Sequence, residues 1–393
     1  MGHLDLAPLA DQLFDSAVDT RRHIHTYPEL GFEEKATTAL VQERLSALGL
    51  EELAAGTETG AVFRLKGGRP GRGVLLRADI DALPVAEEVD VPFRSKVEGV
   101  MHACGHDAHV AILLATAEIF STLAEELPGS YVFLFQPAEE LLAGASRMIE
   151  GGVLDGLGAE RVLSLHVSSP LPPGLVAVRS GIMMSQAQPI TARLRGSGGH
   201  GAQAQAEGNV ILAVSRLASR LPEVVEGMEY EWAACACSTG AIRAGTAANV
   251  IPRDAVLRGS LRTYTADQYG EALKRLDAVA ADVASEFGVS VDLDLPTPVP
   301  PVENQAEAVS TWSAAAAEMI GAANVIAIPP VPMSDDISEF LRRIPGVHFF
   351  VGARPGTGEP AQHHSSEFTI DEESIRVGIK TMAAGAVALA GRG

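Results

Sequence analysis

The sequence predicts an α/β fold: a mixed, largely parallel sheet flanked by helices, with a ferredoxin-like α+β domain inserted into it. Three observations predict this fold. Short apolar segments alternate with helical segments over residues 1–183, the order changes to strand–helix–strand–strand–helix–strand over 184–297, and the first pattern resumes over 298–393. Buried apolar strands that alternate with helices are typical of sheets covered on both faces. We therefore expect one main domain in two segments, 1–183 and 298–393, and an inserted domain of residues 184–297.

The elements of the main domain follow from hydrophobic spacing. Apolar residues at helical intervals predict helices over 11–22, 33–48 and 110–120, with Gly49 capping the second. Continuous apolar runs of strand length predict buried strands. These runs cover residues 60–65, 73–77, 131–135, 161–167 and 347–351.

The inserted domain shows the element order of a ferredoxin-like fold. Its predicted strands cover residues 188–195, 235–243, 254–264 and 289–295, and its predicted helices cover 209–220 and 266–287. Cys235 and Cys237 alternate along one of these strands, so both side chains face the same way and we interpret them as core packing. The proline-rich stretch 296–301 is expected to lead back to the main domain.

Length and composition exclude several classes of protein. A chain of 393 residues is too long for one core, which favours two domains. The net charge is −20 and no Lys/Arg-rich run occurs, so nucleic acid is excluded as a partner. Three cysteines make a poor disulfide framework and indicate a reducing compartment, which we expect to be the cytoplasm. We find no signal-peptide pattern and no apolar run of membrane-spanning length, so no membrane association is expected.

Residues 102–109, His-Ala-Cys-Gly-His-Asp-Ala-His, concentrate one thiol, three imidazoles and one carboxylate. Such groups are ligands for divalent metals, and Cys104 and His106 stand two residues apart before a predicted helix. A buried thiol beside a structural histidine is the alternative interpretation, because free cysteine is often a small core residue. His166 ends a predicted strand, and His363 and His364 form a pair near the C-terminus; each could be a ligand or a structural residue.

Two adjacent carboxylates, Glu139 and Glu140, follow the predicted strand 131–135. On extended backbone they would point in opposite directions, so that one could bind a metal while the other acts on a water molecule. The alternative is a solvated acidic pair that opens a helix over 142–150. The polar residues gather at the carboxyl ends of strands, where open α/β sheets place their active sites.

Two glycine-rich segments lie in the predicted inserted domain. His200 lies within Gly-Ser-Gly-Gly-His-Gly, and Asn249 lies within Gly-Thr-Ala-Ala-Asn-Val-Ile-Pro. Glycine lets the backbone approach a ligand closely, but it equally suits a simple turn.

Several long segments in order resemble one enzyme family. They cover residues 22–34, 76–84, 101–107, 135–140 and 244–252. Together they resemble the dinuclear metal amidohydrolases of the aminoacylase and carboxypeptidase superfamily. The branch is that of hippurate hydrolase, bacterial N-acyl-amino-acid amidohydrolases and plant indole-acetyl-amino-acid hydrolases.

The resemblance implies five ligands for two divalent metal ions, with one ligand bridging them. The five are Cys104, His106, Glu140, His166 and His364. Zn²⁺ is expected first and Mn²⁺ next, and Co²⁺ or Ni²⁺ also suit these ligands. The resemblance further makes Glu139 the general base and places Asp79 and Asp81 behind the ligands, which they would orient.

Two residues of the inserted domain also gain roles from the resemblance. It makes His200 reach across a dimer interface to the substrate, and Asn249 contact the substrate. The inserted domain would then act as a lid and form a homodimer or a higher homo-oligomer.

The implied activity is hydrolysis of N-acyl-amino acids, such as N-acetyl or N-benzoyl derivatives, to a carboxylic acid and an amino acid. A dipeptidase or carboxypeptidase of the same fold is one alternative. A metal-binding module without activity is another, favoured by the stretch 203–210, where Gln205 replaces the family's second histidine.

Overall fold

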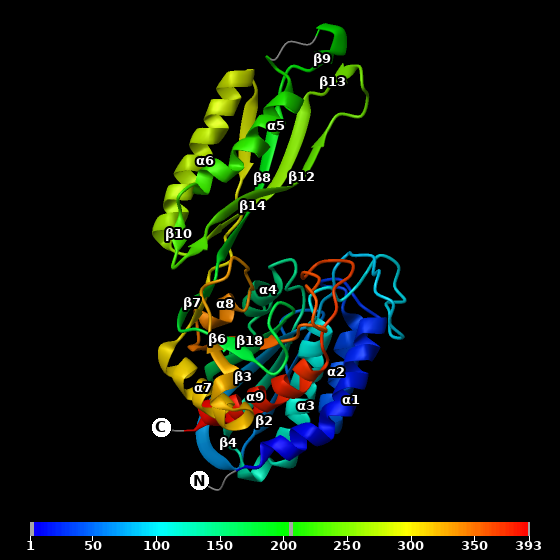
Figure 1. Cartoon of the computed structure of the whole chain (residues 1–393), viewed down its shortest axis with the longest axis vertical. Coiled ribbons are helices and arrows are strands. Elements are labelled where there is room, and N and C mark those ends of the chain that lie inside the picture. Colours follow the sequence, from blue (N-terminus) through cyan, green and yellow to red (C-terminus); the bar gives the residue numbers. More distant parts are fainter. Residues whose placement is uncertain (1–3, 204–206, 392–393) are drawn as a thin grey trace. The chain divides into compact units, whose positions relative to one another are not determined.

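The computed structural model describes residues 4–203 and 207–391. They divide into two compact units (Figure 1). The first comprises the described residues up to Gly181 together with Glu303–Ile328 and Asp336 onwards, and the second comprises Ile182–Val302 and Pro329–Asp335. The domain boundaries predicted from the sequence, at 183/184 and 297/298, remain predictions.

The first unit contains an eight-stranded mixed sheet with the order β1-β2-β4-β3-β5-β18-β6-β17. β3 runs parallel to β4 and β5, β5 parallel to β18, and β6 parallel to β17, whereas the other pairs are antiparallel. The bounds are β1 Glu51–Leu53, β2 Ala61–Lys66, β3 Arg69–Asp79, β4 Pro128–Gln136, β5 Ala159–Ser168, β6 Val176–Val178, β17 Val325–Ala327 and β18 Gly346–Gly352. The predicted mixed, largely parallel sheet is thus confirmed.

Helices flank this sheet. They are α1 Leu6–Thr26, α2 Lys35–Ala47, α3 His106–Thr122, α4 Gly144–Glu150, α7 Ala306–Ile320, α8 Ser338–Leu341 and α9 Glu373–Ala390. α3 and α9 pack on the sheet, α1 packs on both of them, and α7 packs on α9 and β18. α3 is buried almost all round because it lies between the sheet and α1, which explains its apolar sequence. None of the helices in the described residues has the length and apolar character that crossing a membrane requires.

The start of α3 depends on one glycine. Gly105 precedes the helix with φ of 92°, and a Cβ at that position would lie 2.4 Å from Cγ2 of Val167 on β5. Only glycine allows both this left-handed conformation and this close approach. Gly105 therefore brings Cys104 and His106 against the end of β5, and the helix begins at His106, four residues before the predicted start at 110.

The carboxyl ends of three neighbouring parallel strands meet at one edge of the sheet. β3 ends at Asp79, β4 at Gln136 and β5 at Ser168. Because the strands are parallel, the loops that follow them collect at this edge, as in other open α/β sheets. The candidate metal-binding and catalytic residues of the first unit lie on or beside these loops.

The second unit is a four-stranded antiparallel sheet, in the order β12-β14-β8-β15, on which α5 and α6 pack. Its main elements are β8 Gln186–Arg195, α5 Val210–Arg220, β12 Ala236–Ala244, β14 Asp254–Thr263, α6 Ala266–Phe287 and β15 Ser290–Asp294. This is the predicted ferredoxin-like order. Cys235 and Cys237 lie in its apolar core.

Shorter strands complete the chain. β9 Gly199–His200 pairs with β13 Val250–Ile251, and β10 Glu229–Tyr230 pairs with β11 Ala233–Ala234. β7 Gly181–Met184 and β16 Val302–Asn304 stand where the chain passes from one unit to the other.

A pair of glycine substitutions tests the packing of α9. A Cβ on Gly385 of α9 would lie 2.2 Å from Cδ1 of Trp312 on α7, whereas a Cβ on Gly270 of α6 would meet nothing within 4 Å. Gly270→Ala should stabilise the protein by about 0.5–1 kcal/mol through lower backbone entropy of the unfolded chain. Gly385→Ala should instead destabilise it by about 1–3 kcal/mol, because overpacking outweighs that gain. Thermal unfolding followed by circular dichroism checks both, and equal stability of the two variants would contradict the packing described.

Candidate metal centre

Side chains from separate segments of the chain meet at the carboxyl edge of the first unit's sheet. All five residues that the resemblance implies as ligands are among them: Cys104, His106, Glu140, His166 and His364. Sγ of Cys104 lies 3.4 Å from Nε2 of His166. Nε2 of His364 lies 3.3 Å from Oε2 of Glu140.

Two of the groups of potential ligand atoms share the sulfur of Cys104. One atom each from Cys104, His106 and His166 lie within 4.8 Å of one another, and so do atoms from Cys104, Glu140 and His364. Thiolate, imidazole and carboxylate are the ligands that zinc takes in proteins. The geometry therefore offers metal ligands in two groups that have the Cys104 sulfur in common.

The electrostatics at His106 fit a cation. This imidazole is buried, and its Nε2 lies 3.7 Å from Asp79 and 3.8 Å from both Glu139 and Glu140. Burial lowers the pKa of His106, but Asp79, Asp81 and Glu140 outweigh burial and raise that pKa to about 10. The surrounding carboxylates thus favour positive charge at this point.

Two buried atoms also await a partner. Nε2 of His106 and Oε1 of Glu140 have no hydrogen bond among the described residues. A buried polar atom without a partner is unfavourable, and bound metal ions would satisfy both atoms. The residues present therefore fit a divalent metal centre.

Hydrogen bonds set which ring nitrogens could bind a metal. Nδ1 of His106 lies 3.0 Å from the carbonyl oxygen of Asp81 and 3.1 Å from its Oδ1, and Nδ1 of His166 lies 2.6 Å from the carbonyl oxygen of Val167. A carbonyl oxygen can only accept, so both Nδ1 atoms carry a proton, and Nε2 is the nitrogen that has the lone pair when each ring is neutral and able to bind a metal. Each imidazole thus turns a lone pair towards the centre. That Asp81 orients His106 for metal binding remains a prediction.

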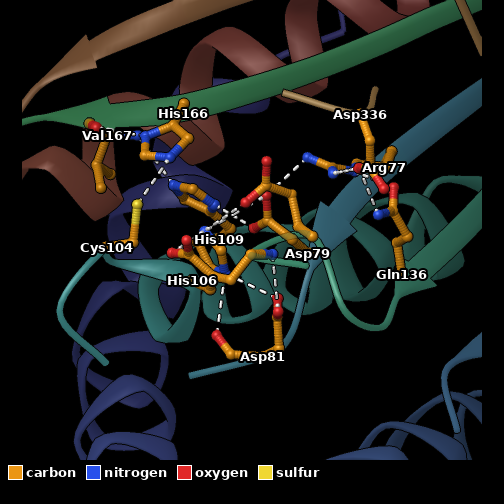
Figure 2. Close-up of polar contacts among 12 residues, drawn as sticks. Arg77, Asp79, Asp81, Cys104, His106, His109, Gln136, His166, Val167 and Asp336 are labelled. Atoms are coloured by element: carbon orange, nitrogen blue, oxygen red, sulfur yellow. Dashed lines mark hydrogen bonds and ion pairs between the residues drawn. The ribbon is translucent and has the colours of Figure 1, made fainter. Parts of the chain in front are cut away.

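His109 belongs to the same network, although sequence analysis assigned it no role beyond its place in the 102–109 cluster. Its Nδ1 lies 2.5 Å from Oδ1 of Asp79, and the backbone N–H of Val167 donates to its Nε2 over 2.9 Å. Figure 2 shows His109 between Asp79 and the end of β5 beside His166. His109 therefore links β3 to the residue next to a candidate ligand.

Asp79 is also held from its other side. Arg77 donates to Asp79 over 2.7 Å, to Gln136 over 2.9 Å and to Asp336 over 3.2 Å (Figure 2). Burial raises the pKa of Asp79, but His106, Arg77 and His109 outweigh it and hold that pKa well below its usual range. Asp79 thus stays ionised behind His106, in the position predicted for an orienting residue.

The orientation expected for the two glutamates is wrong. Glu139 and Glu140 lie in a turn, not on extended backbone, because Ala138 takes a φ of 53° and the N–H of Leu142 donates to the carbonyl oxygen of Glu139 over 2.6 Å. The turn brings both carboxylates to 3.8 Å from Nε2 of His106, so they do not point in opposite directions. The helix expected from 142 begins only at Gly144.

His200 and Asn249 lie together in the second unit. His200 pairs with Val250 across β9 and β13, the N–H of Gly201 donates to the carbonyl oxygen of Asn249 over 2.9 Å, and both side chains are exposed. The N–H of Ala202 donates to Nδ1 of His200 over 3.1 Å, so the ring proton lies on Nε2. Their contacts with a substrate remain predictions. Gln205 lies outside the described residues.

Comparison with known proteins agrees with this geometry. Residues 75–387 match peptidase family M20/M25/M40. The chain is 33% identical over 375 residues to an N-acetylcysteine deacetylase of Bacillus subtilis, covering 94% of this chain and 96% of that protein. It is 34% identical over 376 residues to thermostable carboxypeptidase 1 of Saccharolobus solfataricus, covering 93% of each.

A solved structure gives the same result. The structure of a dinuclear metal binding peptidase from the M20 family of Bacillus subtilis matches with a TM-score of 0.78 and 30% identity. The match covers 97% of this chain and 99% of that one. The resemblance drawn from the sequence motifs is confirmed, and the chain is a hydrolase that belongs to peptidase family M20/M25/M40.

Proposed function

We propose that this protein hydrolyses the amide bond of N-acyl-amino acids at a centre of two divalent metal ions, releasing a carboxylic acid and an amino acid. The observation that carries the proposal is the position of Glu139, whose carboxylate lies 3.8 Å from His106 beside the five candidate ligands. A carboxylate at that place can move protons for a reaction at the metal ions. The relationship to a deacetylase of an N-acylated amino acid supports this class of substrate.

In this proposal Cys104, His106, His166, Glu140 and His364 would hold the two ions, and Cys104 is common to both groups of candidate ligands. This mixture of thiolate, imidazole and carboxylate favours Zn²⁺, and Mn²⁺, Co²⁺ or Ni²⁺ also suit it. Bound ions would polarise the substrate carbonyl and lower the pKa of a water molecule towards 7.

The protein's own residues supply the remaining steps. Glu139 accepts a proton from the attacking water and later donates it to the leaving amine. His200 presents its Nε2 proton to the carbonyl oxygen as negative charge develops there. Asn249, beside His200, contacts the substrate. We infer that His200 comes from a second copy of the chain, which makes the active form a homodimer, and that the enzyme works in the cytoplasm.

A dipeptidase or carboxypeptidase activity is the second candidate, and the relationship to thermostable carboxypeptidase 1 favours it. The metal-loaded protein should be offered N-acetyl and N-benzoyl amino acids alongside dipeptides, with release of free amine measured. Preference for the acylated amino acids supports the main proposal, whereas preference for dipeptides replaces it. A metal-binding module without activity would release no amine from any of them.

Metal removal should destabilise the protein, because the clustered carboxylates lose their counter-charge. A bound ion stabilises the folded state by about 4 kcal/mol when its concentration is 1,000 times its Kd. Chelation should therefore lower Tm, and added Zn²⁺ should restore it. Cys104→Ala should lower the metal content and should abolish most of the rise in Tm that Zn²⁺ produces. Cys237→Ala, a change of another buried cysteine in the second unit, is the control and should keep the rise.

Replacement of the proposed base should separate chemistry from metal binding. Glu139→Gln should retain two metal ions per chain but lose turnover by roughly 10²–10⁴, because the amide cannot accept the proton. Metal analysis by mass spectrometry and single-turnover hydrolysis measure the two effects. Near-normal turnover in this variant would refute the assignment of Glu139.

Mixed dimers test the role of His200. His200→Ala should lower turnover by roughly 10²–10³. If His200 serves the centre of the other copy, co-expression of His200→Ala with Glu139→Gln should yield dimers with one complete site and recover activity. Absence of recovery, when mixed dimers are shown to form, would contradict action across an interface.

A further inference from the structure

We propose that His363 is a positioning residue that donates a hydrogen bond from its Nδ1 to the thiolate of Cys104. It would hold this sulfur in the place from which both metal ions are reached. The inference rests on the proposed two-metal centre and adds to it a residue outside the set of ligands. Sγ of Cys104 lies 3.6 Å from Nδ1 of His363.

The direction of this hydrogen bond follows from the other ring nitrogen. The backbone N–H of Ser169 donates to Nε2 of His363 over 3.3 Å, so Nε2 carries no proton. An imidazole in a protein keeps at least one ring proton, which must then lie on Nδ1. His363 therefore turns an N–H, not a lone pair, towards the sulfur.

His166 approaches the same sulfur with the opposite polarity. Its Nδ1 donates to the carbonyl oxygen of Val167, so its Nε2 carries a lone pair in the neutral ring. This Nε2 lies 3.4 Å from Sγ of Cys104. Two histidines thus contact one sulfur, and their backbone partners decide that His363 faces it with an N–H and His166 with a lone pair. His166 can bind a metal through the nitrogen that faces Cys104, whereas His363 cannot do so without losing the hydrogen bond from Ser169.

The local backbone explains how two consecutive histidines both reach the centre. His364 has a φ of 68°, and its N–H donates to the carbonyl oxygen of Ala103 over 2.8 Å, next to Cys104. Ser169 also donates through its hydroxyl to the carbonyl oxygen of Ala361 over 3.0 Å. Hydrogen bonds therefore hold the backbone on both sides of His363. The left-handed conformation of His364 points its side chain in a different direction from the one it would take on extended backbone.

Packing fixes the ring of His363. Its centroid lies 4.7 Å from that of Phe368 and 5.4 Å from that of His166, so rotation away from Cys104 would break these contacts. Burial raises the pKa of Cys104, and the nearby carboxylates of Glu140, Glu139 and Asp79 raise it further. A thiolate at this position is therefore electrostatically unfavourable. An N–H directed at the sulfur offsets part of this unfavourable charge.

Cobalt substitution gives a direct test, because the energy of the sulfur-to-cobalt charge-transfer band reports on hydrogen bonding to the thiolate. A hydrogen bond stabilises the sulfur lone pair, so its loss shifts the band to longer wavelength. His363→Leu should show this shift in the Co²⁺-loaded protein. Its affinity for Co²⁺ should fall roughly 10–100-fold in competition with a chelator, as expected when a group that orients a ligand is removed.

Two further variants make the result specific. His363→Asn places an amide N–H near the position of Nδ1 and should keep the band close to that of the wild type, which also guards against misfolding of the leucine variant. Gln362→Leu changes the exposed neighbouring side chain and should alter neither band nor affinity. Both should retain two Co²⁺ ions per chain.

An unshifted band and unchanged affinity in His363→Leu would overturn the proposal. So would loss of one metal ion in both His363 variants, since His363 would then be a ligand, or a Co²⁺-loaded wild type without a sulfur-to-cobalt band. If the bands behave as expected but no N-acyl-amino acid is hydrolysed, the hydrogen bond stands and the proposed substrate is refuted.

Discussion

The site depends on negative charge gathered around one buried imidazole. Asp79, Asp81, Glu139 and Glu140 all approach His106 at a place from which solvent is largely excluded. Like charges repel strongly in a medium of low dielectric constant, so this grouping is stable only with compensating positive charge. Arg77 compensates part of it behind Asp79, and metal ions between the ligands would compensate the rest.

A second buried ion-pair cluster holds the helix that carries His106. Arg21 donates to Asp107 over 2.8 Å, and Nδ1 of His25 lies 2.8 Å from the same oxygen. Burial raises the pKa of Asp107, but Arg21 and His25 outweigh it and hold that pKa well below its usual range. Because Asp107 follows His106 directly, this cluster ties α1 to the first turn of α3. The metal centre is thus braced by the fold as well as by its own ligands.

The sequence predicted the central strands of the first sheet and the four strands of the second, because apolar strands and amphipathic helices leave a periodic pattern, but it missed the three-residue strands β1, β6 and β17. Residue type and position at strand ends marked the candidates, and the family resemblance singled out the five ligands among them. The directions in which the side chains of the site point could not be predicted from the sequence. The turn at Ala138, which redirects Glu139 and Glu140, and the hydrogen bonds that fix His109 and His363 all depend on contacts between distant segments. Spacing along the chain does not encode such contacts.

Cys104 is common to both groups of candidate ligands and would join the two metal ions. Anomalous diffraction from crystals of the zinc-loaded protein, recorded on both sides of the zinc absorption edge, tests this most directly. We expect two anomalous peaks about 3.5–4 Å apart, with the sulfur of Cys104 within bonding distance of both. A single peak, or two peaks of which neither contacts Cys104, would contradict it.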